Sequence, residues 1–266
     1  MATNQNFALI TGATSGIGYE LAKLFAKDHY NLVIVARNEE ELKKTATELK
    51  QDSDIQVVTI AKDLFKREAA FEVYDEVKAK GIEIEVLVND AGQGQYGEFI
   101  NTDINRELDI IQLNIGSVVT LTKCFLKDMV ARGSGKILNL ASIASKLPGP
   151  LQSVYHGTKA FVYSFSESIR SEVKDKGVTV TALLPGATDT DFFNKADMED
   201  SKMVQETKLS DPAKVAKDGY EALMSGDDKV VSGLKNKAMV AMGTVMPDEK
   251  VADMMHEQQA PVGKDR

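Results

Sequence analysis

The stretch Thr11-Gly12-Ala13-Thr14-Ser15-Gly16-Ile17-Gly18 follows a short apolar run, Phe7 to Thr11, and precedes a segment with helical periodicity. Its three glycines allow the chain to turn sharply and allow backbone N–H groups to approach a ligand closely. The N-terminus of the helix that follows favours negative charge. The stretch therefore predicts a strand, a tight turn and a helix that together bind an anionic group. For a glycine triplet taken alone, a simple turn-and-packing role is the alternative.

Outward from this turn, apolar β-rich runs alternate with helix-period segments along most of the chain. Parallel strands need long crossover connections, and helices supply them. Runs such as VIVA at 33–36 and VTALL at 180–184 are almost wholly apolar, as expected for strands buried on both faces. This order predicts an α/β fold: a single-domain, Rossmann-like, doubly wound parallel sheet of about seven strands, flanked by helices on both faces.

The expected elements cover most of the chain. The strands are expected at 7–11, 32–36, 55–60, 85–89, 136–141, 178–184 and 229–231. Beyond the helix that opens at Ile17, helices are expected at 39–50, 67–80, 102–131, 153–175 and 211–224. Without a linker or an internal repeat, residues 1–266 are interpreted as one nucleotide-binding domain. Residues 187–206 are polar and lack periodicity, which predicts a loop able to cover a site, and 235–258 is a Met-rich helical segment.

Composition narrows the classes of function. The net charge of −8 works against nucleic-acid binding, because a protein must neutralise phosphates with Lys and Arg. No run approaches the roughly 18 consecutive apolar residues of a membrane-spanning helix, and the polar segment 1–7 lacks the features of a secretory signal. The single cysteine, Cys124, excludes an internal disulfide and suits a reducing compartment. We therefore expect a cytoplasmic protein with no nucleic-acid or membrane partner.

Three further motifs follow the glycine turn in order. They are Asn89-Asp90-Ala91-Gly92 after the fourth strand, Tyr155-x-x-x-Lys159 on a helix, and Pro185-Gly186-Ala187-Thr188-Asp189-Thr190 after the sixth strand. With the T-G-x-x-x-G-x-G turn, this set resembles the short-chain dehydrogenase/reductase family over residues 11 to 190. Asp90 departs from the family's usual second asparagine. The resemblance implies an oxidoreductase that binds a nicotinamide dinucleotide.

The resemblance also implies where the dinucleotide binds. Asp63 and Leu64 would lie beside the adenine, Asn89 and Gly92 near the adenosine ribose, and Thr190 near the nicotinamide carboxamide. The complete set of expected cofactor-binding residues is Gly12, Thr14, Ser15, Gly16, Ile17, Gly18, Arg37, Asp63, Leu64, Asn89, Ala91, Gly92, Tyr155, Lys159, Pro185, Gly186, Thr188 and Thr190.

The end of the second strand bears on the choice between NAD(H) and NADP(H). A carboxylate there would accept the adenosine ribose hydroxyls and repel a 2′-phosphate. The strand ends Val35-Ala36-Arg37-Asn38, without a carboxylate. Arg37 can make charge-assisted hydrogen bonds to a phosphate, so NADP(H) is predicted to be preferred over NAD(H). A solvated arginine at a strand end is the alternative.

Tyr155 and Lys159 are four residues apart, so they share one face of a helix. A positive charge nearby lowers the pKa of a tyrosine, and Lys159 together with an oxidised nicotinamide is expected to supply it. Tyr155 is then the expected general acid/base in the interconversion of a carbonyl and a secondary alcohol. Ser142, rather than nearby Ser145, is expected to bind the substrate oxygen. The resemblance adds Asn114, which would hold a water beside Lys159; a helix bend is the other interpretation.

Several other residues are assigned structural roles. No metal is expected, because the histidines at 29, 156 and 256 are far apart in sequence. His156 lies off the face of Tyr155 and Lys159, and Cys124 is expected to belong to the core.

The substrate stays open at this stage. Its contacts are expected in 93–97, 143–154 and 187–205, where Leu147, Leu151, Phe192 and Phe193 form an apolar pocket or pack ordinarily. An aliphatic ketone, a 3-hydroxy acid, an acyl thioester and a steroid-like molecule all fit. The alternative function is a non-catalytic NADP(H)-binding regulator.

Two further features concern association. The resemblance implies a homodimer or homotetramer, through the helices that contain Tyr155 and Pro212. The Met-rich C-terminal segment is expected to pack on the sheet or line the pocket, with contact to a membrane or a partner as the alternative.

Overall fold

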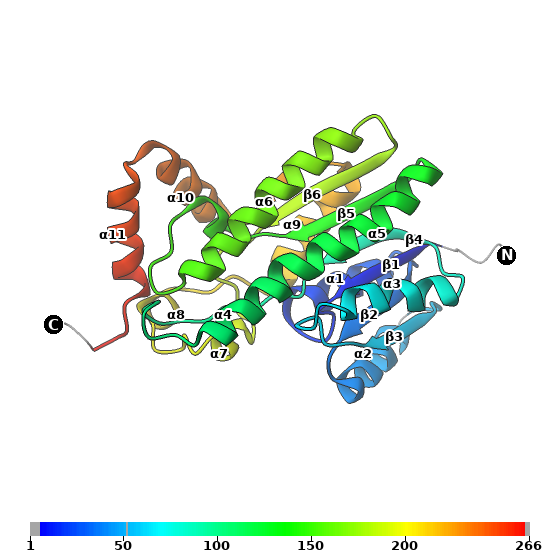
Figure 1. Cartoon of the computed structure of the whole chain (residues 1–266), viewed down its shortest axis with the longest axis horizontal. Helices are drawn as coiled ribbons and strands as arrows, with labels where there is room; N and C mark the ends of the chain where they lie inside the picture. Colours follow the sequence, from blue (N-terminus) through cyan, green and yellow to red (C-terminus); the bar gives the residue numbers. More distant parts are fainter. Residues whose placement is uncertain (1–5, 52, 264–266) are drawn as a thin grey trace.

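The computed structural model describes residues 6–51 and 53–263. Within them, one parallel sheet has the strand order β3-β2-β1-β4-β5-β6-β7 (Figure 1). The strands are β1 (Phe7–Thr11), β2 (Asn31–Ala36), β3 (Val57–Ala61), β4 (Ile84–Asn89), β5 (Gly135–Leu140), β6 (Val178–Leu184) and β7 (Lys229–Val231). This order confirms the predicted doubly wound α/β fold, and every predicted strand boundary lies within two residues of the observed one.

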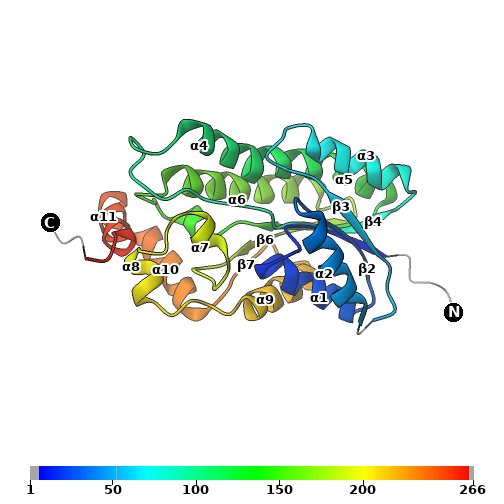
Figure 2. The same cartoon turned by 90° about the horizontal axis from the view of Figure 1, so that it is seen from below.

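Helices cover both faces of the sheet, as Figure 2 shows edge-on. One face packs against α1 (Gly16–Lys27), α2 (Glu39–Gln51) and α9 (Pro212–Ser225). The other packs against α3 (Ala69–Ala79), α5 (Ser117–Arg132) and α6 (Ser153–Val173). Central strands such as β1 are buried along their whole length, which is why their sequences are continuously apolar.

Helix α1 illustrates how the packing is achieved. Leu21 and Phe25 are four residues apart, so both point at the sheet, and both are fully buried. The Phe25 ring meets Tyr30 and Tyr220 edge-on, with centroids 5.3 and 4.8 Å away. Burial of each such side chain contributes about 1.5–3 kcal/mol. This packing fixes the direction of α1 and therefore of the glycine turn that precedes it.

The predicted single helix over 102–131 is interrupted. It consists of α4 (Ile104–Ile111), a π-helical turn η1 (Gln112–Gly116) and α5. Within the continuous stretch Ile104–Arg132, one 18-residue window has a mean hydropathy of 1.2, so by length and composition the stretch could cross a membrane. Its buried side chains, Leu121 and Phe125 among them, instead belong to the core beside the sheet.

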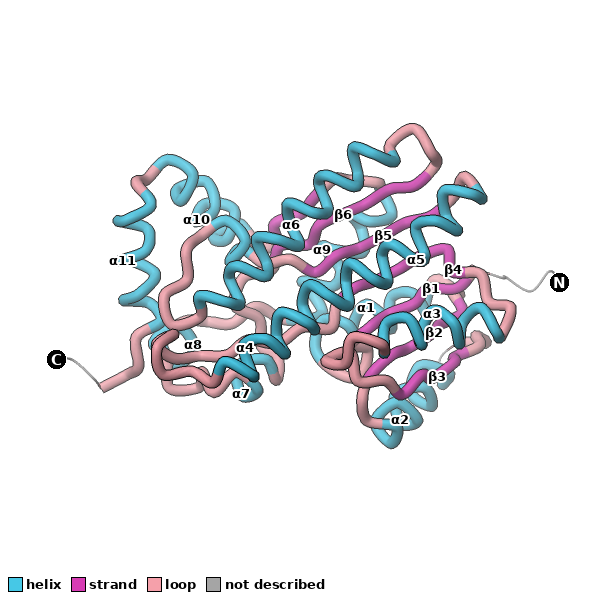
Figure 3. Tube along the Cα trace, in the orientation of Figure 1, coloured by secondary structure: helices cyan, strands magenta, loops and turns pink. Residues whose placement is uncertain are grey.

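The segment after β6 corrects one prediction. Residues 187–206, expected as a loop, contain two short helices, α7 (Phe192–Lys195) and α8 (Lys202–Glu206). Phe193, Ala196 and Met198 are buried against one another, so tertiary packing, not local periodicity, shapes this segment. Figure 3 shows that α7 and α8 gather with α10 (Leu234–Val245) and α11 (Asp248–Gln259) beyond one end of the strands.

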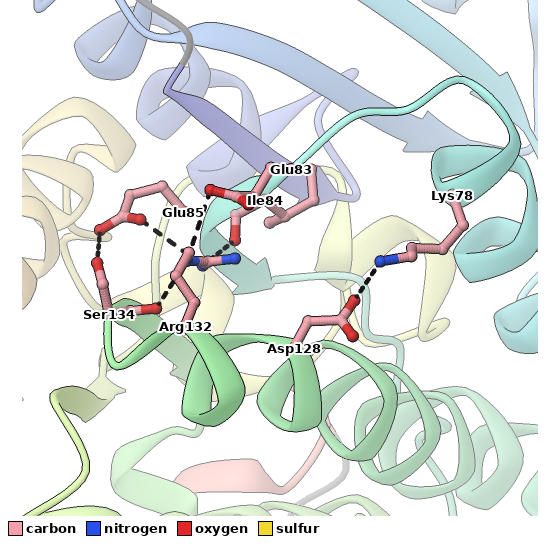
Figure 4. A network of polar contacts seen from close by, with 7 residues as sticks. All are labelled: Lys78, Glu83, Ile84, Glu85, Asp128, Arg132 and Ser134. Atoms are coloured by element: carbon pink, nitrogen blue, oxygen red, sulfur yellow. Dashed lines mark hydrogen bonds and ion pairs between the residues drawn. The ribbon is translucent and has the colours of Figure 1, made fainter.

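The opposite, amino-terminal edge of β4 and β5 is closed by a polar network (Figure 4). Arg132, at the end of α5, donates to the backbone carbonyls of Ile84 at 2.8 Å and Ser134 at 3.2 Å. It also pairs with Glu85 at 3.6 Å, and Ser134 donates to the same carboxylate at 2.8 Å. Nearby, Lys78 of α3 pairs with Asp128 of α5 at 3.0 Å.

The strand order creates a crevice at the carboxyl edge. β1 lies between β2 and β4, so the connections from β1 and β4 leave on opposite faces of the sheet. Thr11 is in register with Asn89, which places the glycine turn directly beside the Asn89–Gly92 segment. Ligands of doubly wound sheets bind at such a point.

Candidate active site

A cavity of about 960 Å³ occupies this crevice and extends to the C-terminal helices. It brings together nearly all of the predicted site residues, which come from segments far apart in sequence. The predicted residues that line it are Gly12, Thr14, Ser15, Gly16, Ile17, Arg37, Asp63, Leu64, Ala91, Gly92, Ser142, Tyr155, Lys159, Pro185, Gly186, Thr188 and Thr190.

The glycine turn needs its glycines for conformational reasons. Gly12 and Gly16 have φ angles of +73° and +58°, a region that residues other than glycine rarely adopt. The Gly12 N–H donates to the Val35 carbonyl at 2.9 Å, which ties the turn to β2. Helix α1 begins at Gly16, and the N–H groups of a first helical turn have no intrahelical partners. The turn therefore offers N–H donors to an anion in the cavity.

The Pro185–Thr190 segment lies across this turn. An added Cβ at Gly16 would stand 3.0 Å from Thr190 Cγ2, so the two segments touch. Thr188 is buried, its hydroxyl donates to the Gly186 carbonyl at 2.9 Å, and its backbone pairs with Ser210. These bonds hold the segment over the cavity between the glycine turn and Tyr155.

The far end of the cavity is lined by the ends of β2 and β3. The Arg37 guanidinium lies over the Phe65 ring, 5.3 Å from its centroid. Asp63 accepts the Phe65 N–H at 3.3 Å, which shapes the turn after β3. Lys62, Asn38 and Glu41 also line this end, so it carries two cations and two carboxylates, and Lys62 pairs with Glu72 at 2.5 Å. Sequence reasoning did not identify Lys62.

The reacting groups meet at the opposite end. Ser142 caps the short 3₁₀ helix η2 (Ile143–Lys146) by accepting the Ala144 N–H at 3.1 Å, and it hydrogen-bonds the Tyr155 side chain. Ser145 instead donates to the Ser142 backbone carbonyl at 2.6 Å. Among the residues that the structure describes, those that line the cavity do not include Ser145. Ser142 is therefore the serine that faces the cavity.

Lys159 together with an oxidised nicotinamide is expected to lower the pKa of Tyr155, and in the protein alone that pKa is raised. Burial raises the pKa of Tyr155 to about 12, and the Ser142 hydrogen bond opposes that rise. The Lys159 Nζ atom lies 5.8 Å from the Tyr155 ring centroid. Within the protein, desolvation outweighs the lysine, so Tyr155 holds its proton at neutral pH.

Lys159 is itself buried and anchored. Its Nζ donates to the Leu140 carbonyl at 2.7 Å, at the end of β5. Burial lowers the pKa of Lys159 to about 8, against the attraction of the Asp90 carboxylate. The ammonium group is thus charged at neutral pH but titrates close to it.

Asn114 lies in the π-helical turn and organises the site through its side chain. Its Oδ1 accepts the Gln93 N–H at 3.0 Å, while its Nδ2 donates to the Gln93 carbonyl and to Thr158 Oγ1, both at 2.9 Å. A Cβ at Gly92 would stand 3.3 Å from both Asn114 Oδ1 and Lys159 Nζ. Asn114 therefore joins the π-helical turn η1 to α6 beside Lys159. The water that Asn114 is expected to hold stays a prediction. The bend interpretation is compatible, since π-turns often mark functional sites.

Among the described residues, three of the predicted set do not line the cavity: Gly18, Asn89 and Asn114. The Asn89 side chain is buried in the sheet, where it donates to Thr122 at 3.1 Å and to Asn139 at 2.8 Å. The expected place of Asn89 near the adenosine ribose stays a prediction, with its side chain turned into the sheet. Gly18 lies behind the turn, where an added Cβ would stand 2.5 Å from Asp90 Oδ2.

Apolar side chains form the wall opposite the reacting groups. The Phe192 ring of α7 lies against Tyr155, with centroids 4.9 Å apart. Leu147 and Met255 are buried in a cluster with Met203 and Met239, and all four line the cavity. The Met-rich C-terminal segment thus lines the pocket, as expected. The sequence does not indicate which individual methionines face the pocket, because they lie outside every recognised motif.

His156 has the structural role that its position predicts. Its Nδ1 bonds the Leu147 carbonyl at 2.8 Å, and its Nε2 lies 3.3 Å from Nε2 of Gln259 in α11. Burial lowers the pKa of His156, which keeps the ring neutral. Tyr96 donates to the Gln259 carbonyl at 2.5 Å. The end of α11 is therefore attached to the helix of Tyr155. In 6–51 and 53–263, no cluster of three or more His, Cys, Asp or Glu side chains suits a metal.

Known proteins share this arrangement. The family model for short chain dehydrogenases matches residues 6–201. The very-long-chain 3-oxoacyl-CoA reductase of Rattus norvegicus is 36% identical over 185 residues, which cover 67% of this chain and 58% of that protein. The 17-beta-hydroxysteroid dehydrogenase type 3 of Mus musculus is 36% identical over 189 residues, 69% of this chain and 60% of that protein. The chain thus spans less than two-thirds of the length of these curated relatives.

Solved structures match nearly the whole chain. A short-chain dehydrogenase from Sphingobium yanoikuyae in complex with NADPH has a TM-score of 0.81 at 26% identity, covering 94% of this chain and 99% of that one. A bulky-bulky ketone specific alcohol dehydrogenase from Comamonas testosteroni has a TM-score of 0.77 at 26% identity, covering 95% and 99%. With the family model, these matches establish that the chain belongs to the short-chain dehydrogenase/reductase family of oxidoreductases.

Proposed function

We propose that the protein is an NADP(H)-dependent oxidoreductase that interconverts a carbonyl and a secondary alcohol. One observation carries the proposal: Ser142, Tyr155 and Lys159 line the same cavity as the glycine turn and Arg37. A nicotinamide dinucleotide fits this cavity, because the N–H donors for a pyrophosphate lie between a cationic end and the reacting groups. The dinucleotide, when bound, supplies or accepts the hydride.

The protein's own residues then handle the oxygen of the substrate. Ser142 can donate a hydrogen bond to that oxygen and stabilise the charge that develops on it. Tyr155 holds its proton at neutral pH, so it can donate that proton to the oxygen during reduction. Lys159 would keep positive charge beside the phenol once the proton has left.

The preference for NADP(H) rests on charge. Arg37 and Lys62 line the end where the adenosine ribose would lie, and the end of β2 carries no carboxylate. Stacking on Phe65 holds the Arg37 guanidinium in place, which lowers the entropy lost when it pairs with a 2′-phosphate. The NADPH complex of the Sphingobium relative is consistent with this preference.

The substrate class follows from the apolar wall. Phe192, Leu147 and the methionines of α8, α10 and α11 present a large, deformable apolar surface next to Tyr155. That surface suits a ketone with a bulky apolar group. The names of the relatives, which include a very-long-chain 3-oxoacyl-CoA reductase and a bulky-ketone dehydrogenase, support the same class.

The test is oxidation of NADPH and of NADH by the purified full-length chain, followed by loss of reduced-nicotinamide absorbance. The substrates are a steroid ketone, a long-chain 3-oxoacyl thioester and a small ketone such as acetone. We expect turnover with NADPH, faster with the bulky ketones than with acetone. Tight binding of NADPH without turnover of any of these would favour the regulatory alternative, and absence of NADPH binding would overturn the proposal.

A further inference from the structure

The Asp90 carboxyl group lies directly behind the glycine turn. Added Cβ atoms at Gly12 and Gly18 would stand 2.9 and 2.5 Å from Asp90 Oδ2, and the Gly18 N–H donates to this group. Its Oδ1 is buried and accepts no hydrogen bond from the described residues. The backbone N–H groups of Asp90 and Ala91 both donate to the Thr11 hydroxyl at 3.1 Å, which fixes the backbone of this segment against β1.

The charges around Asp90 are few. Lys159, from α6, is the ionisable group that acts on it, and β1 and the turn present the neutral Thr11 and Gly12. On α1, Tyr19 pairs with Glu48 and Glu20 pairs with Lys23, so neither is directed at Asp90. β4 and η1 contribute the neutral Asn89 and Asn114. Burial raises the pKa of Asp90 to about 7, although Lys159 and the Gly18 N–H oppose the rise.

A pyrophosphate at the glycine turn would add negative charge on the other side of the same glycines. An ionised Asp90 would repel it across a poorly solvated gap, whereas the neutral acid would not. We propose that dinucleotide binding at the glycine turn is coupled to the uptake of one proton, transferred from the solvent to the Asp90 carboxylate. This inference rests on the proposed function, since it assumes that the turn binds a dinucleotide.

The coupling has a definite sign. A bound pyrophosphate raises the pKa of Asp90 further, so the protonated protein binds the dinucleotide more tightly than the ionised one. Affinity is therefore highest when Asp90 is protonated, falls as the pH rises above about 7, and levels off above the pKa of the complex. Each unit by which the complex raises that pKa corresponds to a tenfold loss of affinity.

The experiment compares NADPH affinity in the wild-type chain and in Asp90→Asn, by fluorescence titration between about pH 7 and about pH 9. The 2′-phosphate, with a second pKa of about 6, keeps a nearly constant charge over this range. We expect wild-type affinity to fall by roughly tenfold across it, and Asp90→Asn to bind roughly tenfold more tightly than wild type at the upper end. Lys159 titrates in the same range, and Asp90→Asn moves that titration to lower pH, so the infrared measurement below separates the two groups. Asp109→Asn, an exposed acid on α4, controls for the lost charge and should follow wild type.

A second measurement reports the protonation of Asp90 directly. The infrared difference spectrum of wild type with and without NADPH, at about pH 7.5, should gain the carbonyl band of a protonated carboxylic acid, which Asp90→Asn should lack. Parallel affinity profiles, or no such band, would overturn the Asp90 inference while leaving NADPH binding intact. If neither the wild-type chain nor either variant binds NADPH at any pH, the proposed function itself fails.

Discussion

The two edges of the parallel sheet hold their polar residues in opposite ways. At the amino edge, Arg132 has two backbone carbonyls and two carboxylates as partners, and the network closes on itself (Figure 4). At the carboxyl edge, Asp90, Gln152 and Gln259 line the cavity and each carries a buried polar atom without a partner. Unpaired buried polar atoms cost stability, so those that line the cavity suit a ligand, whereas the closed Arg132 network suits the fold.

The largest effect should come from the carboxyl edge. Tyr155→Phe removes the phenolic proton donor and keeps the ring, so ketone reduction should fall by about 10²- to 10⁴-fold. NADPH affinity should change little, because the ring still packs on Phe192. Steady-state rates and fluorescence titration measure the two quantities. Tyr163→Phe, on the same helix but away from the cavity, should keep wild-type rates, and retained turnover in Tyr155→Phe would remove Tyr155 from its role.

A smaller effect is expected at the other end of the cavity. Arg37→Ala should weaken NADPH binding about tenfold or more and NADH binding by less than about twofold, because only NADPH carries the 2′-phosphate. Arg106 stacks on the same Phe65 ring, 5.2 Å from its centroid, and holds Gln93. Arg106→Ala should therefore alter both affinities alike. Equal losses for the two cofactors in Arg37→Ala would contradict the proposed phosphate contact.

At the amino edge, the expected effect is on stability alone. Arg132→Ala leaves the Ile84 carbonyl and Glu85 without their partner, at a cost of about 1–3 kcal/mol. A thermal melt should show a midpoint lowered by several degrees, with wild-type NADPH affinity at low temperature. Lys80→Ala, which removes an exposed pair with Glu76, is the control and should change the midpoint much less. An Arg132→Ala protein with reduced NADPH affinity would show that the two edges are not independent.

The last prediction concerns the stability of the carboxyl edge. The folded protein raises the pKa of Asp90 from 3.8 to about 7, so ionisation of Asp90 costs folding free energy. That cost grows as the pH rises from about 4 to about 7 and is then constant. Asp90→Asn should therefore raise the melting midpoint at about pH 8, by an amount that shrinks toward about pH 4. Equal midpoints at all pH values would mean that Asp90 is well solvated.

Much of this molecule is predictable from its sequence, for identifiable reasons. Buried parallel strands are continuously apolar, so β1 to β7 stand out, and the glycine turn has a conformational requirement that few residues meet. The paired residues Tyr155 and Lys159 are likewise local, since one helical turn joins them.

The features that were missed depend on contacts distant in sequence. Helix α7 packs through Phe193 and Ala196 on the distant Tyr96, whose N–H donates to the Ala196 carbonyl at 2.9 Å, and no periodicity reveals these contacts. The raised pKa of Tyr155 arises from burial by several segments, which no local pattern reveals. Asn89 belongs to a recognised motif, yet its side chain bonds to Thr122 and Asn139 inside the sheet. A motif thus locates a backbone segment more reliably than the direction of each side chain.

The central claim is that the carboxyl-edge cavity is a site of hydride transfer to a carbonyl. The most direct measurement uses NADPH carrying deuterium at both C4 positions with a bulky ketone substrate, followed by mass spectrometry of the alcohol formed. The account predicts that the product carries one deuterium on its carbinol carbon. Wild type should form this product, and Tyr155→Phe should form the same product far more slowly. An alcohol formed without deuterium, or NADPH bound by the protein with no alcohol formed from any bulky ketone, would contradict it.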